Sequence, residues 1–273
     1  MTSRVVGHVP RKRFGQNFLH DTNVIRRIAA CIAPTAGQRV LEIGPGQGAL
    51  TQPLLDSGAQ VTAIEIDRDL AAALRSRYAN TPLFILHAMD ALKLDLTAIS
   101  EGSHLPWRVV GNLPYNISTP LLFHLLGQRQ CIADMHFMLQ KEVVDRLIAE
   151  PNTADYGRLS VMAQYYCDVV HAFDVSPGAF FPVPKVMSAI VRLVPRQPMT
   201  EAACESVLST VVSAAFSQRR KTLRNTLAAL LDETEIRLAD VDPSARAETL
   251  CVNQFVSLAN RLVLQRQQRR REV

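Results

Sequence analysis

Four short apolar runs rich in β-branched residues recur at nearly even intervals and constrain the fold more than any other feature. They are RVLEIG (39–44), VTAIEID (61–67), PLFILHA (82–88) and WRVVGN (107–112). The stretches between the first three runs carry apolar residues at helical spacing. Strands that alternate with helices in this way form βαβ units, so the pattern predicts an α/β fold with a parallel sheet covered by helices on both faces.

The rest of the chain extends this sheet and then changes character. A further strand is predicted over 133–140, followed by a helix that starts near Lys141. Two longer strand-like runs, 165–175 and 186–194, predict an antiparallel hairpin at the sheet edge. Beyond residue 198 no good strand is found, and three amphipathic stretches predict helices at 204–218, 221–231 and 252–265. We therefore expect two domains, 1–197 and a small helical domain over 198–273.

Positive charge is clustered in three short segments. The net charge is +5, with RKR at 11–13, RRKTLR at 219–224 and RQQRRR at 266–271. A single such cluster is usually a solvated face, whereas three in an otherwise balanced chain favour a polyanionic partner. The candidate RNA-binding residues are those at the start of a predicted second-domain helix, namely Arg219, Arg220, Lys221 and Arg224.

Several classes of protein are disfavoured by composition. No apolar run approaches the roughly 18 residues needed to cross a bilayer. The first twenty residues carry charges and Pro10 where a signal peptide would be apolar, so we expect a cytoplasmic protein without a membrane partner. The five cysteines form no CxxC pair and the seven histidines show no metal-ligand spacing, so no metal is expected.

A glycine-rich segment follows the first predicted strand. EIGPGQGALT (42–51) places Gly44, Gly46 and Gly48 at G-x-G-x-G spacing, which brings backbone close to a ligand. This spacing suits a carboxylate and a ribose better than a pyrophosphate, because the dinucleotide fingerprint has one more residue before its third glycine. Glu65 ends the second strand about twenty residues later, where a carboxylate can accept hydrogen bonds from ribose hydroxyls, as it also does for NAD.

The third and fourth strands also end in polar residues. Asp90 could accept a hydrogen bond from an exocyclic amine such as that of adenine, and Asn112 ends the fourth strand. A single acidic residue at such a place is more often a helix N-cap than a ligand. Because ligands bind at the carboxyl ends of parallel strands, polar groups at four successive strand ends predict an adenosine pocket.

The turn Asn112-Leu113-Pro114-Tyr115 suggests a reaction. It resembles the (Asn/Asp/Ser)-Pro-Pro-Tyr signature of methylases that act on exocyclic amines of bases, with S-adenosylmethionine as methyl donor. An adenine N6 amine is a poor nucleophile because its lone pair is delocalised into the ring. The Asn112 side-chain oxygen and the Pro114 carbonyl can accept the amine protons and draw the nitrogen toward tetrahedral geometry, while Tyr115 stacks on the ring.

Motifs along nearly the whole chain carry a more specific resemblance. They are FGQNFLHD (14–21), EIGPGQGALT, NLPYNIST (112–119), MLQKEVVDRL (138–147), YGRLSV (156–161), FFPVPKVMSAIVRL (180–193), QRRKTLRNTL (218–227) and RAETL (246–250). Together they resemble the ribosomal RNA adenine N6-dimethyltransferase family, most closely its bacterial small-subunit branch. The resemblance implies a Rossmann-like class I methyltransferase domain with a helical RNA-binding domain, acting as a monomer.

The same resemblance implies a substrate and a set of site residues. The expected product is dimethyladenosine at two adjacent adenosines in a hairpin near the 3′ end of 16S rRNA, within the small ribosomal subunit and as part of its biogenesis. The implied S-adenosylmethionine contacts are Asn17 and Leu19 from the amino-terminal motif, with Gly44, Glu65, Asp90 and Asn112. Phe180 matches the aromatic that sandwiches the target base opposite Tyr115. Met187 and Asn152 depart from the residues common in the family, and neither is part of the proposed chemistry.

Three alternatives remain open on the sequence. The first is a methylase of the macrolide-resistance type that acts on large-subunit rRNA, against which the segment 218–227 and the close match at 112–119 argue. The second is a non-catalytic RNA-binding assembly factor, which the intact glycine loop and turn disfavour. The third is an NAD-dependent oxidoreductase, which the glycine spacing and the lack of a plausible hydride-transfer acid disfavour.

Overall fold

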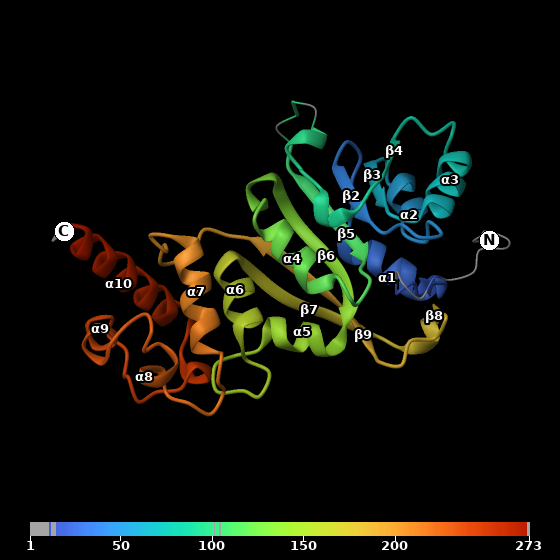
Figure 1. Cartoon of the computed structure of the whole chain (residues 1–273). Helices are drawn as coiled ribbons and strands as arrows, with labels where there is room; N and C mark the ends of the chain where they lie inside the picture. Colours follow the sequence, from blue (N-terminus) through green and yellow to red (C-terminus); the bar gives the residue numbers. More distant parts are fainter. Residues whose placement is uncertain (1–10, 12–14, 101, 104, 272–273) are drawn as a thin grey trace. The chain divides into compact units, whose positions relative to one another are not determined.

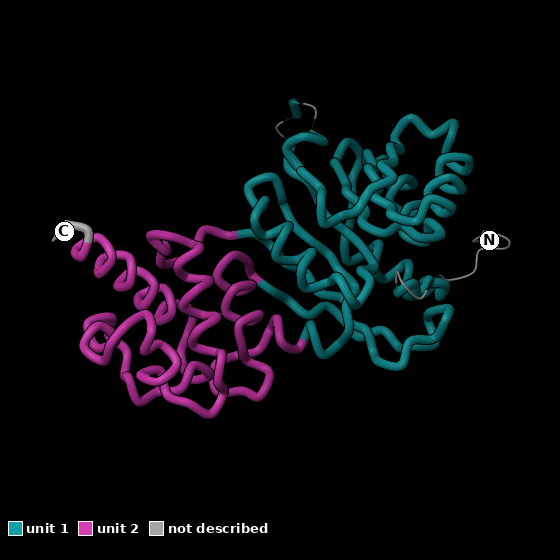
Figure 2. Tube along the Cα trace, in the orientation of Figure 1, with its two compact units in different colours: residues 1–144, 169–195 teal, residues 145–168, 196–273 magenta. Residues whose placement is uncertain are grey.

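The computed structural model describes residues 11, 15–100, 102–103 and 105–271, the side chains of the last two excepted. The chain divides into two compact units (Figure 2), one of residues 1–144 and 169–195 and one of residues 145–168 and 196–273. The second unit therefore begins after the sheet's last strand and also includes an earlier helical segment. The predicted domain boundary at residue 197 stays a prediction.

The first unit is built on a seven-stranded sheet in the order β4-β3-β2-β5-β6-β9-β7 (Figure 1). The strands are β2 (Arg39–Ile43), β3 (Gln60–Glu65), β4 (Phe84–Ala88), β5 (Trp107–Asn112), β6 (Ile132–Gln140), β7 (Cys167–Val175) and β9 (Ser188–Pro195). The pairs β2–β3, β2–β5, β3–β4 and β5–β6 are parallel, whereas β6–β9 is antiparallel. The predicted Rossmann-like sheet is confirmed, with the two late strands as neighbours at its edge.

The first five helices are α1 (Thr22–Ile32), α2 (Thr51–Asp56), α3 (Arg68–Arg77), α4 (Ser118–Leu126) and α5 (Lys141–Ile148). Helices α2 and α3 confirm the two predicted between the first three strands, and α5 confirms the one predicted to start near Lys141, whereas α1 and α4 were not predicted. Two start at aspartate N-caps: Asp21 accepts hydrogen bonds from the first turn of α1, and Asp67 accepts one from the first turn of α3. Asp67 follows the end of β3 by two residues, so its cap places the start of α3 at the carboxyl edge of the main sheet.

A small two-stranded sheet is formed by two segments that lie near the two ends of the first unit's sequence. Strand β1 (Phe18–Leu19) pairs antiparallel with β8 (Phe180–Phe181), in the register Phe18 with Phe181 and Leu19 with Phe180. Leu19 and Phe180 belong to the buried apolar core. This pairing joins the amino-terminal segment to a loop that is more than 150 residues later in the chain.

The second unit is helical. Its helices are α6 (Arg158–Tyr166), α7 (Glu205–Ala215), α8 (Leu223–Thr226), α9 (Glu233–Leu238) and α10 (Val252–Arg271), preceded by the end of α5. The predicted helices at 204–218 and 252–265 are confirmed. The one predicted over 221–231 is wrong in length, because α8 has only four residues. Residues 227–230 form a bend and a turn, and Asp232 then caps α9 by accepting from Glu235 N at 2.9 Å.

Candidate active site

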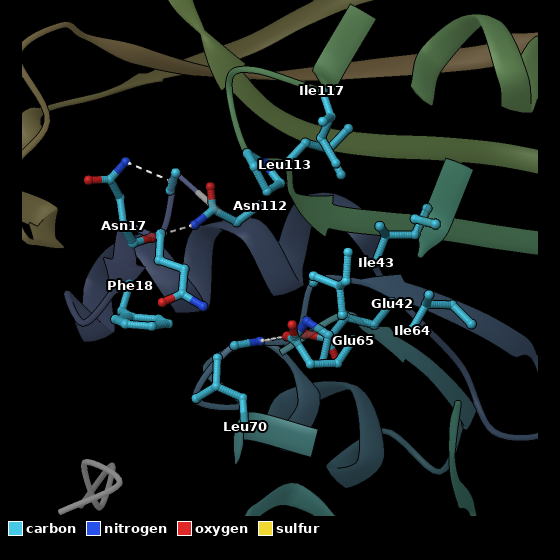
Figure 3. Close-up of a pocket in the computed structure, with 18 of the residues that line it drawn as sticks. Asn17, Phe18, Glu42, Ile43, Ile64, Glu65, Leu70, Asn112, Leu113 and Ile117 are labelled. Atoms are coloured by element: carbon cyan, nitrogen blue, oxygen red, sulfur yellow. Dashed lines mark hydrogen bonds between the residues drawn. The ribbon is translucent and has the colours of Figure 1, made fainter. Parts of the chain in front are cut away.

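A pocket of about 330 Å³ lies at the carboxyl ends of β2, β3, β4 and β5 and beneath the amino-terminal segment 15–19 (Figure 3). This volume is within the range of small-molecule sites. The residues predicted to bind a cofactor all line it, namely Asn17, Leu19, Gly44, Gly46, Glu65, Asp90 and Asn112. Pro114 and Tyr115 line the same pocket. Strand ends far apart in the sequence are therefore brought together as the parallel sheet predicts.

The glycine loop depends on backbone angles that other residues rarely adopt. Gly44 and Gly46 have φ values of 66° and 57°, in the left-handed region. A Cβ at Gly46 would also lie 3.1 Å from the Phe18 ring, which covers this part of the loop. The backbone N–H of Gly46 donates to Glu65 Oε2 at 3.1 Å. The loop is thus tied to the carboxylate at the end of the neighbouring strand.

Glu65 is held with both carboxylate oxygens in defined positions. It is 5 % exposed and, besides Gly46, accepts a hydrogen bond from Asp67 N at 2.9 Å through Oε1. Burial raises the pKa of Glu65 above its ordinary value, and the two backbone donors oppose that rise. Carboxylate oxygens fixed in this way at a pocket wall are suited to accept hydrogen bonds from a diol.

A second buried carboxylate, Glu42, was not among the predicted site residues. It lines the pocket, is 2 % exposed, and accepts a hydrogen bond from Thr51 Oγ1 at 2.6 Å. Burial raises its pKa to about 7, and the negative charge of Glu65 adds to this effect although the Thr51 hydrogen bond opposes it. The signal in the sequence is an acidic residue inside an otherwise apolar strand, two positions before Gly44.

Asp90 lies in the pocket wall and also caps a helix. Its side chain accepts from Leu92 N at 3.0 Å at the start of the 3₁₀ helix Ala91–Lys93. One carboxylate oxygen is used in this cap. The contact with an adenine amine stays a prediction.

The predicted catalytic turn begins at the last residue of β5. The Asn112 side-chain amide donates to the backbone carbonyl of Asn17 at 2.9 Å (Figure 3). Because the N–H₂ group is used in this contact, the Asn112 Oδ1 atom remains as the acceptor of that side chain. The amino-terminal segment thus orients the amide at the end of β5.

The rest of the turn is anchored to the start of α4 and to β9. The Pro114 carbonyl accepts from Ile117 N at 3.1 Å, and it retains a second lone pair for another donor. The Tyr115 carbonyl accepts from Ser118 Oγ at 3.1 Å, and the Tyr115 and Ser188 hydroxyls share a hydrogen bond of 2.8 Å. Burial raises the pKa of Tyr115. The ring therefore stands at the pocket wall with its backbone and its hydroxyl both fixed.

Phe180 is not brought to this pocket. It is 1 % exposed, packs in the apolar core, and is paired with Leu19 across the small sheet. Its neighbour Phe181 is 55 % exposed. Successive residues of a strand point to opposite sides, so the register decides which phenylalanine is buried. Phe180 is not among the residues that line the pocket, and its role as a base clamp stays a prediction.

The amino-terminal segment is fastened at both ends of the stretch that lines the pocket. Gln16 Nε2 donates to Asp67 Oδ2 at 3.0 Å, and Arg11 forms an ion pair of 3.0 Å with Asp67 Oδ1. Asp67 is itself buried at 0 % exposure. On the other side, Asn17 is held by Asn112 and the chain continues into β1. Asp67 is a second residue that the sequence argument missed, because it reads only as a helix cap.

The predicted RNA-binding residues lie in the second unit, in the turn before α8 and within it. All four are exposed. Arg219 is paired with Glu248 at 3.6 Å and Arg224 with Glu233 at 3.8 Å. Arg220 and Lys221 have no side-chain ion pair within the described residues. Lys12 and Arg13 of the first basic segment lie outside the described residues.

The part of the chain that the structure describes holds neither a cluster of metal-ligating side chains nor a membrane-spanning helix. No group of three or more histidine, cysteine, aspartate or glutamate side chains there could hold a metal ion. No described helix is long and apolar enough to cross a membrane.

The sheet order and the strand-end pocket define a class I methyltransferase fold with a nucleoside-sized site. The chain matches the family described as ribosomal RNA adenine dimethylase over residues 7–263. It is 58% identical over 255 residues to ribosomal RNA small subunit methyltransferase A of Methylococcus capsulatus, covering 93% of this chain and 98% of that protein. The protein of the same description from Pseudomonas aeruginosa is 56% identical, with 95% and 97% covered.

Solved structures are similar as well. The crystal structure of the 23S rRNA methyltransferase ErmE superposes with a TM-score of 0.68 and 30% identity, covering 90% of this chain and 100% of that one. A dimethyladenosine transferase from Plasmodium falciparum gives a TM-score of 0.74 at 24% identity, with 92% and 98% covered, and supports the fold alone. This protein belongs to the ribosomal RNA adenine dimethylase family.

Proposed function

We propose that this protein is an enzyme that transfers methyl groups from S-adenosylmethionine to the N6 amines of two adjacent adenosines. The target is a hairpin near the 3′ end of 16S rRNA within the small ribosomal subunit, and the reaction contributes to subunit biogenesis. The observation that carries this proposal is that Asn112, Pro114 and Tyr115 line the same pocket as Gly44 and Glu65. An acceptor pair for an amine thus borders a site for a nucleoside.

The residues present fit S-adenosylmethionine. Glu65 presents a fixed carboxylate to the ribose hydroxyls, and Asp90 accepts from the adenine amine with the oxygen that its cap leaves available. Gly44 and Gly46 allow the backbone to approach the methionine portion, and the segment at Asn17 and Leu19 covers the site. The group supplies an electrophilic methyl on a positively charged sulfur when it is bound.

The chain's own contribution to the transfer is positioning and electrostatics. Asn112 Oδ1 and the second lone pair of the Pro114 carbonyl accept the two amine protons of the target base, which favours a tetrahedral nitrogen. Tyr115 stacks on the adenine ring and fixes its approach, and stacking of this kind is worth about 1–3 kcal/mol. Phe180 is the proposed partner of Tyr115, and this role requires a rearrangement from its buried position. No strong base is needed, because an N-methylated aminium is acidic enough to lose its proton to water or to a nearby carbonyl.

The partner is 16S rRNA in the small subunit, bound by the protein as a monomer in the cytoplasm. Arg219, Arg220, Lys221 and Arg224 contribute phosphate contacts from the second unit. A hairpin loop lowers the cost of moving the target base out of its stack into the pocket. The five-unit positive net charge is consistent with a polyanionic partner.

A large-subunit methylase of the macrolide-resistance type is the second candidate. It is disfavoured because identity is 58% to a small-subunit relative and 30% to the 23S enzyme. The test is transfer of labelled methyl from S-adenosylmethionine to immature small subunits, and in parallel to large-subunit rRNA, followed by mapping of the modified bases. Two adjacent dimethyladenosines in the small-subunit hairpin are expected. Label only in large-subunit rRNA would overturn the proposed small-subunit substrate. No label in either RNA would support a non-catalytic assembly factor.

A further inference from the structure

Tyr115 is fixed to the protein at two separate points. Its backbone carbonyl is held by Ser118 at the start of α4, which sets the path of the turn. Its side chain ends in a hydroxyl whose partner is Ser188 Oγ at 2.8 Å, the one hydrogen bond found for that hydroxyl in the described part of the chain. Backbone and ring are therefore positioned by different elements.

Ser188 is placed rigidly at the start of β9. It is 0 % exposed, and its Cα partner on β6 is Gln140, the last residue of that strand. The adjacent Met187 carbonyl accepts from Lys141 N at 2.9 Å, which closes the ladder where β6 passes into α5. A side chain in this position has little freedom to move with the ligand.

The register of three strands brings the two hydroxyls together. On β5, Asn112 is opposite Met138 of β6, and Met138 is opposite Ile190 of β9. Leu113 N extends this ladder by donating to the Met138 carbonyl at 3.2 Å. The turn after β5 therefore passes the end of β6 and arrives beside the first residue of β9.

We infer that Ser188 is a positioning residue that holds the Tyr115 ring in the orientation needed to stack on the target adenine. The inference rests on the proposed function, because it assigns Tyr115 to the base. The phenol oxygen lies on the axis about which the ring turns, so a hydrogen bond to it fixes the direction of that axis. The hydroxyl is directed to β9 by its hydrogen bond with Ser188, which leaves the face of the ring at the pocket wall for the base.

The second methyl transfer should depend on this contact more than the first. A monomethylated amine must present its lone pair with one substituent already in place, so a narrower range of base positions is productive. Loss of one neutral hydrogen bond corresponds to about a fivefold to tenfold change in rate when it acts mainly on the transition state. Ser188→Ala should therefore slow the second transfer by about this factor and accumulate monomethyladenosine.

The experiment compares the full-length wild type with Ser188→Ala, Tyr115→Phe and the double variant in single-turnover methylation of immature small subunits. Mass analysis of the nucleosides gives the rate of each transfer. Tyr115→Phe keeps the ring and removes the hydroxyl, so it should reproduce the product ratio of Ser188→Ala, and the double variant should be no worse than either. Tyr115→Phe also tests the inference if Ser188→Ala does not fold. Ser160→Ala is the matched control, since Ser160 is a 0 % exposed serine in α6 whose hydroxyl donates to the Arg146 carbonyl.

The outcomes distinguish failure of the proposed role of Ser188 from failure of the proposed function. A wild-type product ratio from Ser188→Ala, with an active wild type, overturns the role of Ser188 and leaves the proposed function standing. Multiplying effects in the double variant overturn it too, because the hydroxyls would then act independently. An equal rise in monomethyladenosine from Ser160→Ala would show that lower stability alone is responsible. A wild type that forms no dimethyladenosine overturns the proposed function, and this inference falls with it.

Discussion

Replacement of Glu42 by glutamine should stabilise the protein at alkaline pH, and by progressively less as the pH becomes acidic. Glu42 is a buried residue of the strand-end pocket lining, and burial raises its pKa from 4.5 to about 7, with Glu65 adding to the rise. The folded state therefore binds this proton more tightly than the unfolded state does. The contribution of Glu42 to stability is largest below pH 4.5, falls as the pH rises from 4.5 to about 7, and is then constant.

The size of the effect follows from the same two values. The gap between 4.5 and about 7 corresponds to about 3 kcal/mol of unfolding free energy. Glutamine is neutral at every pH and its amide oxygen can still accept from Thr51. We expect Glu42→Gln to exceed the wild type by about 3 kcal/mol at pH 8 and by about 1 kcal/mol at pH 5.

The assay is urea unfolding of both proteins at pH 5 and pH 8, without ligand. The quantity that matters is the difference between variant and wild type, because every other ionisable group then cancels. Glu142→Gln, on the exposed side of α5, is the control for removal of one negative charge. An equal gain at both pH values would refute the raised pKa, and a loss at pH 8 alone would show that the charged form is the stabilised one.

Three further predictions concern the ligands. Glu65→Ala should weaken S-adenosylmethionine binding by about 1–3 kcal/mol, because ribose hydroxyls and two backbone donors lose their acceptor; unchanged affinity in calorimetry would exclude the ribose contact. Arg220→Gln with Lys221→Gln should make the slope of log affinity for RNA against log salt shallower by about one to two units, and an unchanged slope would place the RNA on another basic segment. Asn112→Ala should lower single-turnover methylation far more than RNA affinity, since its bond to the amine matters most as the nitrogen rehybridises; wild-type amounts of dimethyladenosine would contradict this.

Much of the fold could be predicted because its signals are local. The apolar runs and the helical spacing between them specify βαβ units, and the carboxyl ends of such strands meet at one edge of the sheet. Gly44, Glu65, Asp90 and Asn112 could therefore be assigned to one pocket before any contact was known. The length of α8 could not be predicted from periodicity, because apolar residues continue at helical spacing to Leu231 whereas the backbone leaves the helix after Thr226.

The residues that the sequence argument missed are those whose role depends on another element. Asp67 reads as the cap of α3, and only the fold shows that Arg11 and Gln16 reach it from the amino-terminal segment. Ser188 reads as the start of a strand, and its contact with Tyr115 requires the order β5-β6-β9. No spacing rule connects residues 73 positions apart, so such pairs emerge only when the sheet is assembled.

The adjacent phenylalanines at 180 and 181 show that strand register alone can decide which of two identical side chains is buried. They are identical residues in the same loop, and the family resemblance assigns the first of them, Phe180, to the target base. The side chains of a strand alternate, so a one-residue change of register exchanges the buried and the exposed ring. With Leu19 opposite Phe180, the first ring fills the core and the second is exposed. A base clamp at Phe180 therefore requires β8 to shift or Phe180 to leave the core when RNA binds, and a buried ring of this size resists that movement because it leaves a cavity behind.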